Sequence, residues 1–492
     1  MHEVFAKTTV DKARLQRARD HLKDQGVRLP TIAELAKPDK ISSETRQALS
    51  DVDPDSADPL NLYRVHWHNG ADRKGQAEMP RHMVLPEALT GVKAKIVVVL
   101  GAGFPMIAAH KVLAAYGCLL PRLLTGQFDP LSQRAVWPST GNYCRGGVAI
   151  STILGCRSVA VLPEGMSAER FDWLAKWVKD PDDIVRTPGS ESNLKEIYDA
   201  CHELAQDERN VILNQFSEFG NYVIHRAVTG KALEAVARSL SEESGIRPRA
   251  FVCASGSAGT IAAGDHLKAS LGMEVAAVEA VECPTLLRNG YGEHNIQGIG
   301  DKHVPLIHNV FGSDYVIGVS DRSSDTLNVL FNSDAGQDYL RAHKGVDADT
   351  LKSLSHLGLS GLANVVAAIK LARFLDLKSD DALVTVATDS AEMYGSQFTK
   401  TLSTRFPDGF TELDAAEVFG REIGGIATDN MLELTRAEKD RIFNLGYYTW
   451  VEQQGTPLEL FEARRDQAFW DGLMDIVPVW DRMIEEFNAS TA

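Results

Sequence analysis

A single lysine interrupts an apolar segment in the first quarter of the chain. The residues from Ile96 to Gly117 read IVVVLGAGFPMIAAHKVLAAYG, and Lys111 is the only lysine between Ile96 and Ala175. Burying an ammonium group costs several kcal/mol or lowers its pKa, and an amine of lowered pKa is a nucleophile. Lys111 is therefore a candidate catalytic residue. The alternative is a lysine whose side chain reaches solvent along a helix face.

Two glycines precede this lysine, in Gly101-Ala102-Gly103, directly after the apolar run. A strand, a tight turn and a helix are typical of a dinucleotide site. That fingerprint requires a third glycine where this chain has Met106, and an acidic residue about twenty residues further on. Neither requirement is met cleanly. We interpret these glycines as a turn that brings the chain into a site, rather than as a nicotinamide-binding loop.

A small polar loop follows a later expected strand. Pro138-Ser139-Thr140-Gly141-Asn142 comes after RAVW and begins the helical segment GGVAISTILG. Its hydroxyl and amide groups would gather at a helix N-terminus, a place that binds carboxylates and phosphates. Because an ordinary helix N-cap uses the same residues, this loop alone leaves both interpretations open.

A second small-residue loop, GSAGT from Gly256 to Thr260, separates the strand AFVCAS from the helical segment IAAGDHLKA. Small residues let the backbone approach a phosphate, and consecutive amides together with a hydroxyl can bind its oxygens. The loop is not a Walker motif, because no GK[ST] follows. It is not a nucleophile elbow either, because GxSxG would need glycine in place of Ser255. A phosphate site and a bare turn are the two remaining interpretations.

Short apolar strands alternate with helical segments over the middle of the chain. The expected strands are LYRVHW, KIVVVL, RAVWP, SVAVLP, VILNQF, AFVCAS, EVAAVEAV, YVIGVS and ALVTVAT. Helical segments such as GGVAISTILG, NLKEIYDACHELA and LANVVAAIKLARFL lie between them. This alternation predicts an α/β fold with open, twisted, mostly parallel sheets and helices on both faces.

The length of 492 residues exceeds what one hydrophobic core usually serves, so we expect two lobes with appended segments. Residues 1–84, polar and helical with an acidic linker, are predicted to be an N-terminal extension. Residues 85–405 would form the catalytic core, with lobes of roughly 85–225 and 226–405. Residues 406–492, acidic, helical and aromatic, are predicted to be a C-terminal extension.

The charge and the cysteine usage exclude several classes of partner. A formal charge of −16 repels phosphate backbones and anionic membrane surfaces, so we expect no nucleic-acid and no membrane partner. The longest apolar run reaches His110 and Lys111 too early to span a bilayer. Six scattered cysteines without a CxxC pair fit a reducing compartment, and the charged opening residues predict no secretory signal. We therefore expect a cytoplasmic protein.

Taken together, the motifs resemble those of the fold type II pyridoxal-phosphate enzymes, the tryptophan synthase β-subunit superfamily. Within it, the resemblance is to the cysteine synthase and cystathionine β-synthase branch. The order is similar: a lysine, an STGN-type loop, a glutamine-containing strand and a Gly/Ser-rich phosphate loop. Further likeness lies in NQFSEFGNYVIHRAVTG, HNIQGIGDKHVP, GLSGLANVVAAIKLAR and ATDSAEMYGS. One departure is the run Ala109-His110-Lys111 in place of the Ser-x-Lys pattern of cysteine synthases; His110 beside the lysine resembles the tryptophan synthase branch.

The resemblance implies pyridoxal 5'-phosphate as the cofactor, with Lys111 as the residue that binds it covalently and takes the substrate α-proton. It implies that Asn142 binds the phenolic oxygen of the cofactor and that Ser360 lies at its pyridine nitrogen. The implied phosphate-binding residues are Gly256, Ser257, Ala258, Gly259 and Thr260. The implied ligands of the substrate carboxylate are Ser139, Thr140, Gly141 and Gln215.

The resemblance also implies β-elimination or β-replacement on a small-molecule amino acid, through an aminoacrylate intermediate. A hydroxyl at the pyridine nitrogen, unlike an aspartate, leaves that nitrogen largely unprotonated, which favours expulsion of a β-substituent. The alternatives are a serine/threonine dehydratase-like or threonine-synthase-like lyase, and a cofactor-binding subunit without turnover. Family members commonly form dimers, so we expect a homodimer.

Two histidines form a candidate metal site. His66 and His68 in VHWHNG alternate along an expected strand and would face one side together. No third cysteine, histidine or carboxylate lies at a suggestive spacing, and a zinc site needs three or four protein ligands. We therefore expect no metal.

Overall fold

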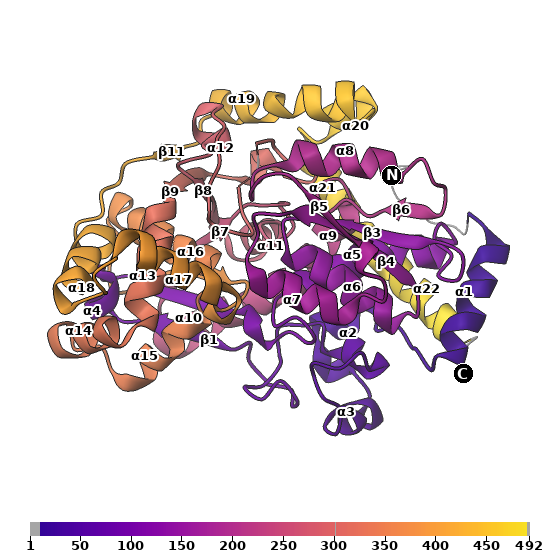
Figure 1. Ribbon diagram of the computed structural model, residues 1–492, viewed down its shortest axis with the longest axis horizontal. Helices are drawn as coiled ribbons and strands as arrows, with labels where there is room; N and C mark the ends of the chain where they lie inside the picture. Colours follow the sequence, from indigo (N-terminus) through magenta and orange to yellow (C-terminus); the bar gives the residue numbers. More distant parts are fainter. Residues whose placement is uncertain (1–9, 301, 490–492) are drawn as a thin grey trace.

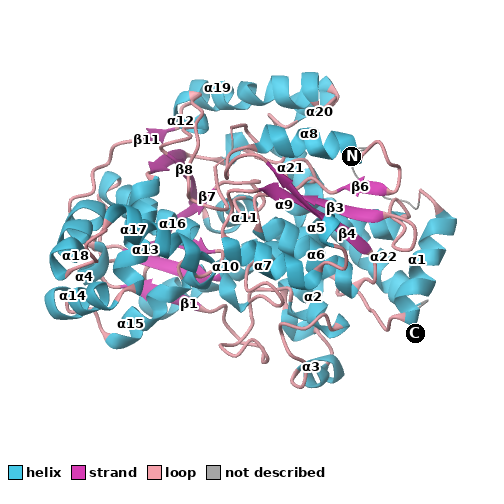
Figure 2. Ribbon diagram, viewed as in Figure 1, coloured by secondary structure: helices cyan, strands magenta, loops and turns pink. Residues whose placement is uncertain are grey.

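The computed structural model describes residues 10–300 and 302–489. It contains two sheets, each flanked by helices (Figures 1 and 2). The larger sheet has seven strands in the order β1 (His82–Leu85), β2 (Lys95–Leu100), β10 (Asp381–Ala387), β7 (Arg247–Ala254), β8 (Glu274–Ala280), β9 (Tyr315–Val319) and β11 (Met431–Glu433). The smaller sheet has four, in the order β5 (Ile184–Thr187), β4 (Arg157–Pro163), β3 (Arg134–Pro138) and β6 (Asn210–Ile212).

The helices fall into three groups along the chain. Those before and within the smaller-sheet region are α1 (Lys12–Asp24), α2 (Ile32–Ala36), α3 (Ser43–Leu49), α4 (Glu87–Thr90), α5 (Lys111–Thr125), α6 (Asn142–Ile153), α7 (Ala168–Trp177), α8 (Leu194–Leu204), α9 (Phe219–Ile224) and α10 (Gly230–Ser244). Those of the larger-sheet region are α11 (Ala262–Leu271), α12 (Thr285–Arg288), α13 (Asp321–Asn332), α14 (Asp334–Lys344), α15 (Ala348–Ser353), α16 (Leu359–Phe374) and α17 (Gly395–Arg405). The C-terminal ones are α18 (Glu412–Phe419), α19 (Arg436–Tyr447), α20 (Leu458–Ala463), α21 (Gln467–Leu473) and α22 (Val477–Ala489).

Parallel pairing dominates both sheets, which confirms the predicted fold class. β2, β10, β7, β8 and β9 run parallel, as do all four strands of the smaller sheet. Among the described strands, only the two at the edges of the larger sheet, β1 and β11, pair antiparallel. The inner strands are continuous apolar runs rather than alternating ones, because helices bury both of their faces. All seven residues of β10 are buried.

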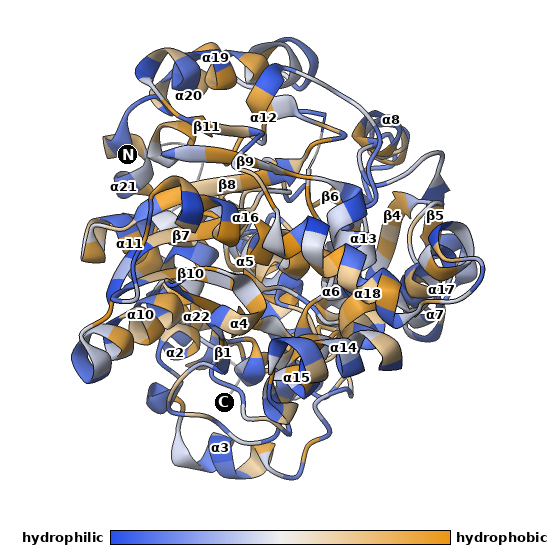
Figure 3. Cartoon of the chain, turned by 90° about the vertical axis from the view of Figure 1, so that its left-hand side faces the viewer, coloured by the Kyte–Doolittle hydropathy of each residue, from blue (hydrophilic) through white to orange (hydrophobic). Residues whose placement is uncertain are grey.

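α16 is the most deeply buried helix that packs on the larger sheet. It contacts β10 and β7, and every residue from Leu359 to Ala372 is buried. A helix buried on all sides carries no polar stripe, and Figure 3 shows it as largely hydrophobic among the apolar strands.

No single helix in the described part of the chain has both the length and the apolar character to cross a membrane, although the bent pair Ala348–His356 and Leu359–Phe374 meets those criteria jointly.

The two terminal segments pack against each other and against α5. α1 and α22 both contact α5, and α2 contacts α22; Figure 1 shows α1 and α22 on the same side of the molecule. The Asn488 side chain accepts a hydrogen bond from the Leu29 amide at 3.0 Å and donates one to the Leu29 carbonyl at 2.8 Å. Tyr116 of α5 donates to the Pro30 carbonyl at 2.6 Å. The terminal segments thus hold in place the helix that begins at Lys111.

The segment LYRVHW was expected to be a strand, and this expectation is wrong. Pro59–Arg64 forms a 3₁₀ helix, with Pro59 in its first turn and Asp58 as its side-chain N-cap. Arg64, at the end of this helix, is buried and donates to the carbonyl of Val52 at 3.0 Å. His66 and His68 therefore lie in a loop. Among the described residues, no group of three or more potential ligands is arranged to hold a metal ion.

The C-terminal segment is mostly helical, as expected, with one difference. Met431–Glu433 forms β11, which pairs antiparallel with β9 from Tyr315 to Ile317. Three residues are too few to give a strand signal in the sequence. An edge strand with unpaired backbone groups attracts such a segment, because each backbone amide and carbonyl needs a partner.

We predict that Asn488→Ala lowers the free energy of unfolding by about 1–3 kcal/mol, because the buried amide and carbonyl of Leu29 lose their partner. Urea unfolding of the full chain measures this. The control is Gln47→Ala at an exposed position of α3, which should change stability by no more than about 0.5 kcal/mol. Equal effects of the two substitutions would contradict a bond between the termini.

Candidate active site

Lys111 is the first residue of α5, at the point where the chain leaves the end of β2. The connection begins with the turn Gly101–Gly103. A Cβ atom on Gly101 would lie 2.8 Å from the carbonyl oxygens of both Ala387 and Thr388, at the end of β10. Only glycine permits this approach of two strand ends. The glycines that suggested a dinucleotide turn thus bring the start of α5 against the carboxyl edge of the larger sheet.

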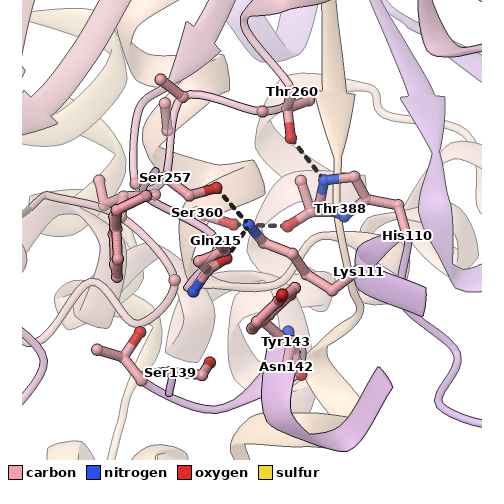
Figure 4. Close-up of a pocket in the computed structure, with 18 of the residues that line it drawn as sticks. His110, Lys111, Ser139, Asn142, Tyr143, Gln215, Ser257, Thr260, Ser360 and Thr388 are labelled. Atoms are coloured by element: carbon pink, nitrogen blue, oxygen red, sulfur yellow. Dashed lines mark hydrogen bonds between the residues drawn. The ribbon is translucent and has the colours of Figure 1, made fainter. Parts of the chain in front are cut away.

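The Lys111 amine points into a pocket between the two sheets, where two side chains accept hydrogen bonds from it (Figure 4). Its Nζ atom donates to Gln215 Oε1 at 2.9 Å and to Ser257 Oγ at 3.0 Å. Gln215 comes from the loop after β6, and Ser257 from the loop after β7. Residues predicted from three separate motifs therefore meet at one nitrogen atom.

The loop from Gly256 to Thr260 lies between β7 and α11 and lines the pocket along its whole length. Ala258 has φ +65°, a left-handed conformation that turns successive amides toward one side. A Cβ atom on Gly256 would lie 2.8 Å from the Gly298 carbonyl oxygen, and one on Gly259 would overlap the Asn221 side chain. With the N-terminus of α11 behind it, this crowded backbone has the geometry and the donors to bind a phosphate.

The STGN loop contributes to the opposite wall of the pocket. Ser139, Thr140 and Asn142 line the pocket, whereas Gly141 does not. The Gly141 amide donates to Ser139 Oγ at 2.8 Å, and a Cβ atom on Gly141 would overlap the Arg170 side chain. Gly141 therefore shapes the loop, and Asn142 begins α6.

Both ends of the Asn142 amide are held by buried charged side chains. Its Nδ2 atom donates to Asp389 Oδ2 at 2.6 Å, and its Oδ1 atom accepts from Arg145 at 2.9 Å. Tyr394 also donates to Asp389, at 2.7 Å, and Arg170 lies 3.8 Å from the same carboxylate. Each charge in this network has a hydrogen-bond partner, which a buried ion requires. The orientation of Asn142 is fixed as a result, with one amide proton left for a ligand in the pocket.

Two hydroxyl groups meet at another wall of the pocket (Figure 4). Ser360, in the first turn of α16, and Thr388, directly after β10, have their oxygen atoms 3.0 Å apart. Both residues line the pocket. Thr388 was not among the predicted site residues, although it lies in ATDSAEMYGS, one of the motifs that carried the family resemblance.

His110 is neutral at the site. Its pKa is lowered to about 3, first by burial and then by the positive charge of Lys111. Its Nε2 atom lies 2.6 Å from Thr260 Oγ1, so the ring connects the start of α5 to the end of the phosphate-type loop (Figure 4). The Trp67 ring, from the N-terminal segment, lies 5.8 Å from the His110 ring. His110 is therefore a positioning residue between the start of α5 and the end of the phosphate-type loop.

Glu191 is a further pocket residue that the sequence did not reveal. It follows the short strand β5 in the stretch TPGSESN, which carries no pattern typical of a site. Burial raises its pKa to about 7, and the Thr140 hydroxyl and the Arg170 charge oppose that rise. A carboxyl group in this state exchanges protons near neutral pH.

The fold and the site together define a pyridoxal-phosphate enzyme of fold type II: two helix-flanked sheets, a lysine at the start of a helix and a phosphate-binding backbone loop opposite it. The family model described as "Pyridoxal-phosphate dependent enzyme" matches residues 105–389. The chain belongs to this family. The expectations of pyridoxal phosphate as cofactor and of an enzyme acting at the amino-acid β-carbon are confirmed at this level.

Curated relatives include cysteine synthases. Cysteine synthase B of Campylobacter jejuni subsp. jejuni is 31% identical over 254 residues, which cover 50% of this chain and 74% of that protein. Cysteine synthase of Staphylococcus aureus is 28% identical over 261 residues, which cover 53% of this chain and 74% of that protein. The expected similarity to the cysteine synthase branch is thereby confirmed.

Solved structures share the fold at lower identity. A hydrogen sulfide-producing enzyme from Fusobacterium nucleatum superposes with a TM-score of 0.53 at 21% identity, covering 64% of this chain and 96% of that one. The O-acetylserine dependent cystathionine beta-synthase from Helicobacter pylori gives a TM-score of 0.51 at 20% identity, covering 64% and 94%. At these identities the comparison establishes the fold alone.

We predict that Gly259→Ala weakens the binding of pyridoxal phosphate at least about tenfold, since 1.4 kcal/mol of strain in the loop suffices for that factor. The added methyl group would displace the loop or the Asn221 side chain. Equilibrium dialysis against the cofactor measures the loss. Gly420→Ala is the matched control, because its Cβ atom would meet no atom within 4 Å. The loop assignment fails if both variants bind the cofactor equally well.

Proposed function

We propose that the protein catalyses β-elimination or β-replacement on a small amino acid, with pyridoxal phosphate as its cofactor. The observation that carries the proposal is the Lys111 amine, held by Gln215 and Ser257 between the STGN loop and the phosphate-type loop. Bound pyridoxal phosphate supplies an electron sink for charge that develops at the substrate α-carbon. The residues around Lys111 then decide which substituent is lost or exchanged.

The residues present fit that cofactor. The loop Gly256–Thr260 would bind the phosphate through backbone amides and the Thr260 hydroxyl, supported by its crowded glycines and the left-handed Ala258. Lys111 would hold the cofactor covalently and, once released by substrate, would take the proton from the α-carbon. Asn142 would donate its remaining amide proton to the ring oxygen.

The substrate carboxylate would bind in the STGN loop. Ser139, Thr140 and Gln215 all line the pocket that the Lys111 amine enters. Gly141 would keep the loop close enough to the substrate, although it does not line the pocket. A neutral set of donors binds a carboxylate without adding a second charge beside the Lys111 amine.

The hydroxyl pair Ser360 and Thr388 supports chemistry at the β-carbon. A hydroxyl donates a hydrogen bond to a ring nitrogen without giving it a proton, whereas a carboxylate would keep that nitrogen charged. The electron sink is then weaker, and departure of a β-substituent competes well with other outcomes. The names of the cysteine synthase relatives support replacement by a sulfur nucleophile over a dehydratase. A homodimer and a cytoplasmic location stay predictions.

We predict that borohydride reduction of the protein loaded with pyridoxal phosphate attaches the cofactor to Lys111. Peptide mass spectrometry should find the added mass on the peptide containing Lys111. Lys111→Ala should bind the cofactor without this covalent link, and the exposed Lys176→Ala on α7 should behave like the wild type. A label on any other lysine would contradict the assignment.

The reaction itself is tested with a series of β-substituted alanines, each with and without added sulfide or thiol. Replacement yields an amino acid that contains the added sulfur. Elimination yields only a keto acid and ammonia. If the loaded wild-type protein releases no β-substituent from any member of the series, the proposed function is wrong.

A further inference from the structure

Glu191 is the only carboxylic acid among the described residues that line the pocket. Its side chain is buried, with 1% of its surface exposed. It lies just beyond the carboxyl end of β5, and the STGN loop follows the carboxyl end of β3 in the same parallel sheet. Strand ends of this kind are where α/β folds gather ligand-binding groups. Glu191 thus belongs to the functional edge of the smaller sheet.

The loop that carries Glu191 is held rigidly. Gly189 has φ +104°, and its carbonyl accepts from the Gly165 amide at 3.0 Å. The Asn193 side chain accepts from the Ser190 amide at 2.9 Å. The Ser192 hydroxyl donates to the Gly292 carbonyl at 2.7 Å. The carboxyl group between these anchors therefore has a fixed place in the pocket.

One oxygen of this carboxyl group, Oε2, is buried and has no hydrogen-bond partner among the described residues. The charged groups that face Glu191 are Arg170 and Lys111. Arg170 is engaged elsewhere: it donates to Ser167 Oγ at 2.7 Å, to Gln297 and to Tyr394. A buried carboxylate without an ion pair is costly, so this group takes up a proton readily. Burial accordingly raises its pKa to about 7.

The chemistry of β-replacement needs two separate proton transfers. One removes the proton from the α-carbon, and in the proposed function Lys111 performs it. The other gives a proton to the group that leaves the β-carbon or takes one from the group that joins it, and the roles proposed for Lys111, Asn142 and the hydroxyl pair do not include this transfer. Glu191 is the pocket residue with a free oxygen and an acid–base function suited to neutral pH.

We propose that Glu191 is the acid–base residue for the β-substituent, an inference that rests on the proposed function. In elimination, the bond from Cβ to the substituent breaks, its electron pair leaves with the substituent, and the neutral Glu191 carboxyl gives that group its proton. In replacement, the incoming nucleophile gives its proton to the Glu191 carboxylate as its electron pair forms the new bond to Cβ. The carboxyl group is then restored for the next cycle.

This role selects a class of second substrate. A proton-bearing nucleophile, such as a thiol, hydrogen sulfide or an alcohol, can give its proton to the carboxylate. A permanently anionic nucleophile has no proton to give and is repelled by the same charge. The site therefore favours neutral thiols or hydrogen sulfide over anions of equal size.

The test compares leaving groups that differ in their need for a proton. Chloride leaves β-chloroalanine without one, whereas the hydroxide of serine needs one. Glu191→Gln should lower the release of the serine hydroxyl by about 10²–10⁴-fold, the usual contribution of a general acid. Its turnover of β-chloroalanine and its exchange of the substrate α-proton with D₂O should stay within about threefold of the wild type. Glu191→Asp, which keeps an acid, should recover part of the serine reaction.

Glu279→Gln is the matched control. Glu279 is also a buried glutamate whose pKa is raised to about 7 by burial. Unlike Glu191, it accepts hydrogen bonds from the backbone amides of Leu286 and Leu287, and it does not line the pocket. Its substitution should change all substrates alike. The inference is wrong if Glu191→Gln shows the same uniform pattern. The proposed function itself is wrong if the wild type neither exchanges the α-proton nor releases any β-substituent.

A second readout needs no turnover and uses the protein before cofactor loading. Because burial raises the pKa of Glu191, its protonated form favours the folded state. This contribution to stability is complete at pH values below the ordinary pKa of a glutamate, and it is lost as the pH rises to about 7. The thermal midpoint of Glu191→Gln should therefore rise relative to the wild type between about pH 5 and about pH 8. A constant difference between the two proteins would contradict the protonation state that the role requires.

Discussion

The rest of the structure depends on one constraint: the Lys111 amine must be held in one orientation, yet remain able to react. Two side chains, Gln215 and Ser257, accept its hydrogen bonds from opposite sheets. Neither acceptor is charged, so neither fixes the amine as a permanent partner in an ion pair. A reactive lysine of this kind needs both sheets at once, which explains why the pocket lies where their carboxyl edges meet.

Close backbone approach keeps those edges together. Gly101 lets the end of β2 reach the end of β10, and Gly259 lets the phosphate-type loop pack on Asn221. The terminal segments act on the other side of the same helix, where Tyr116 binds the Pro30 carbonyl and Asn488 binds Leu29. The extensions outside the family match therefore support the position of Lys111, although none of their described residues lines the pocket.

Buried charge is distributed unevenly around the pocket. Asp389 Oδ2 accepts hydrogen bonds from Asn142 and Tyr394 and lies 3.8 Å from Arg170, so this carboxylate supports Asn142, whereas its Oδ1 atom has no partner among the described residues. Because Arg170 also serves Ser167 and Gln297, it leaves Glu191 without an ion pair. Asp389 thus orients Asn142 from behind the pocket wall, whereas Glu191 lines the pocket, where a ligand can reach it.

The sequence by itself determined the fold class, and its resemblance to a known family pointed to most of the residues that line the pocket. Continuous apolar strands between helices predicted parallel sheets, and the motifs around Lys111, Asn142, Gly256–Thr260 and Ser360 follow strand ends or start helices, where local spacing decides their position. Only the tertiary structure decided the role of Gly141 in shaping its loop, the 3₁₀ turn at Pro59–Arg64, and the presence of Thr388 and Glu191 in the pocket. These depend on contacts between segments far apart in the chain. The state of Glu191 in particular follows from burial and from the competing partners of Arg170, and no local pattern encodes either.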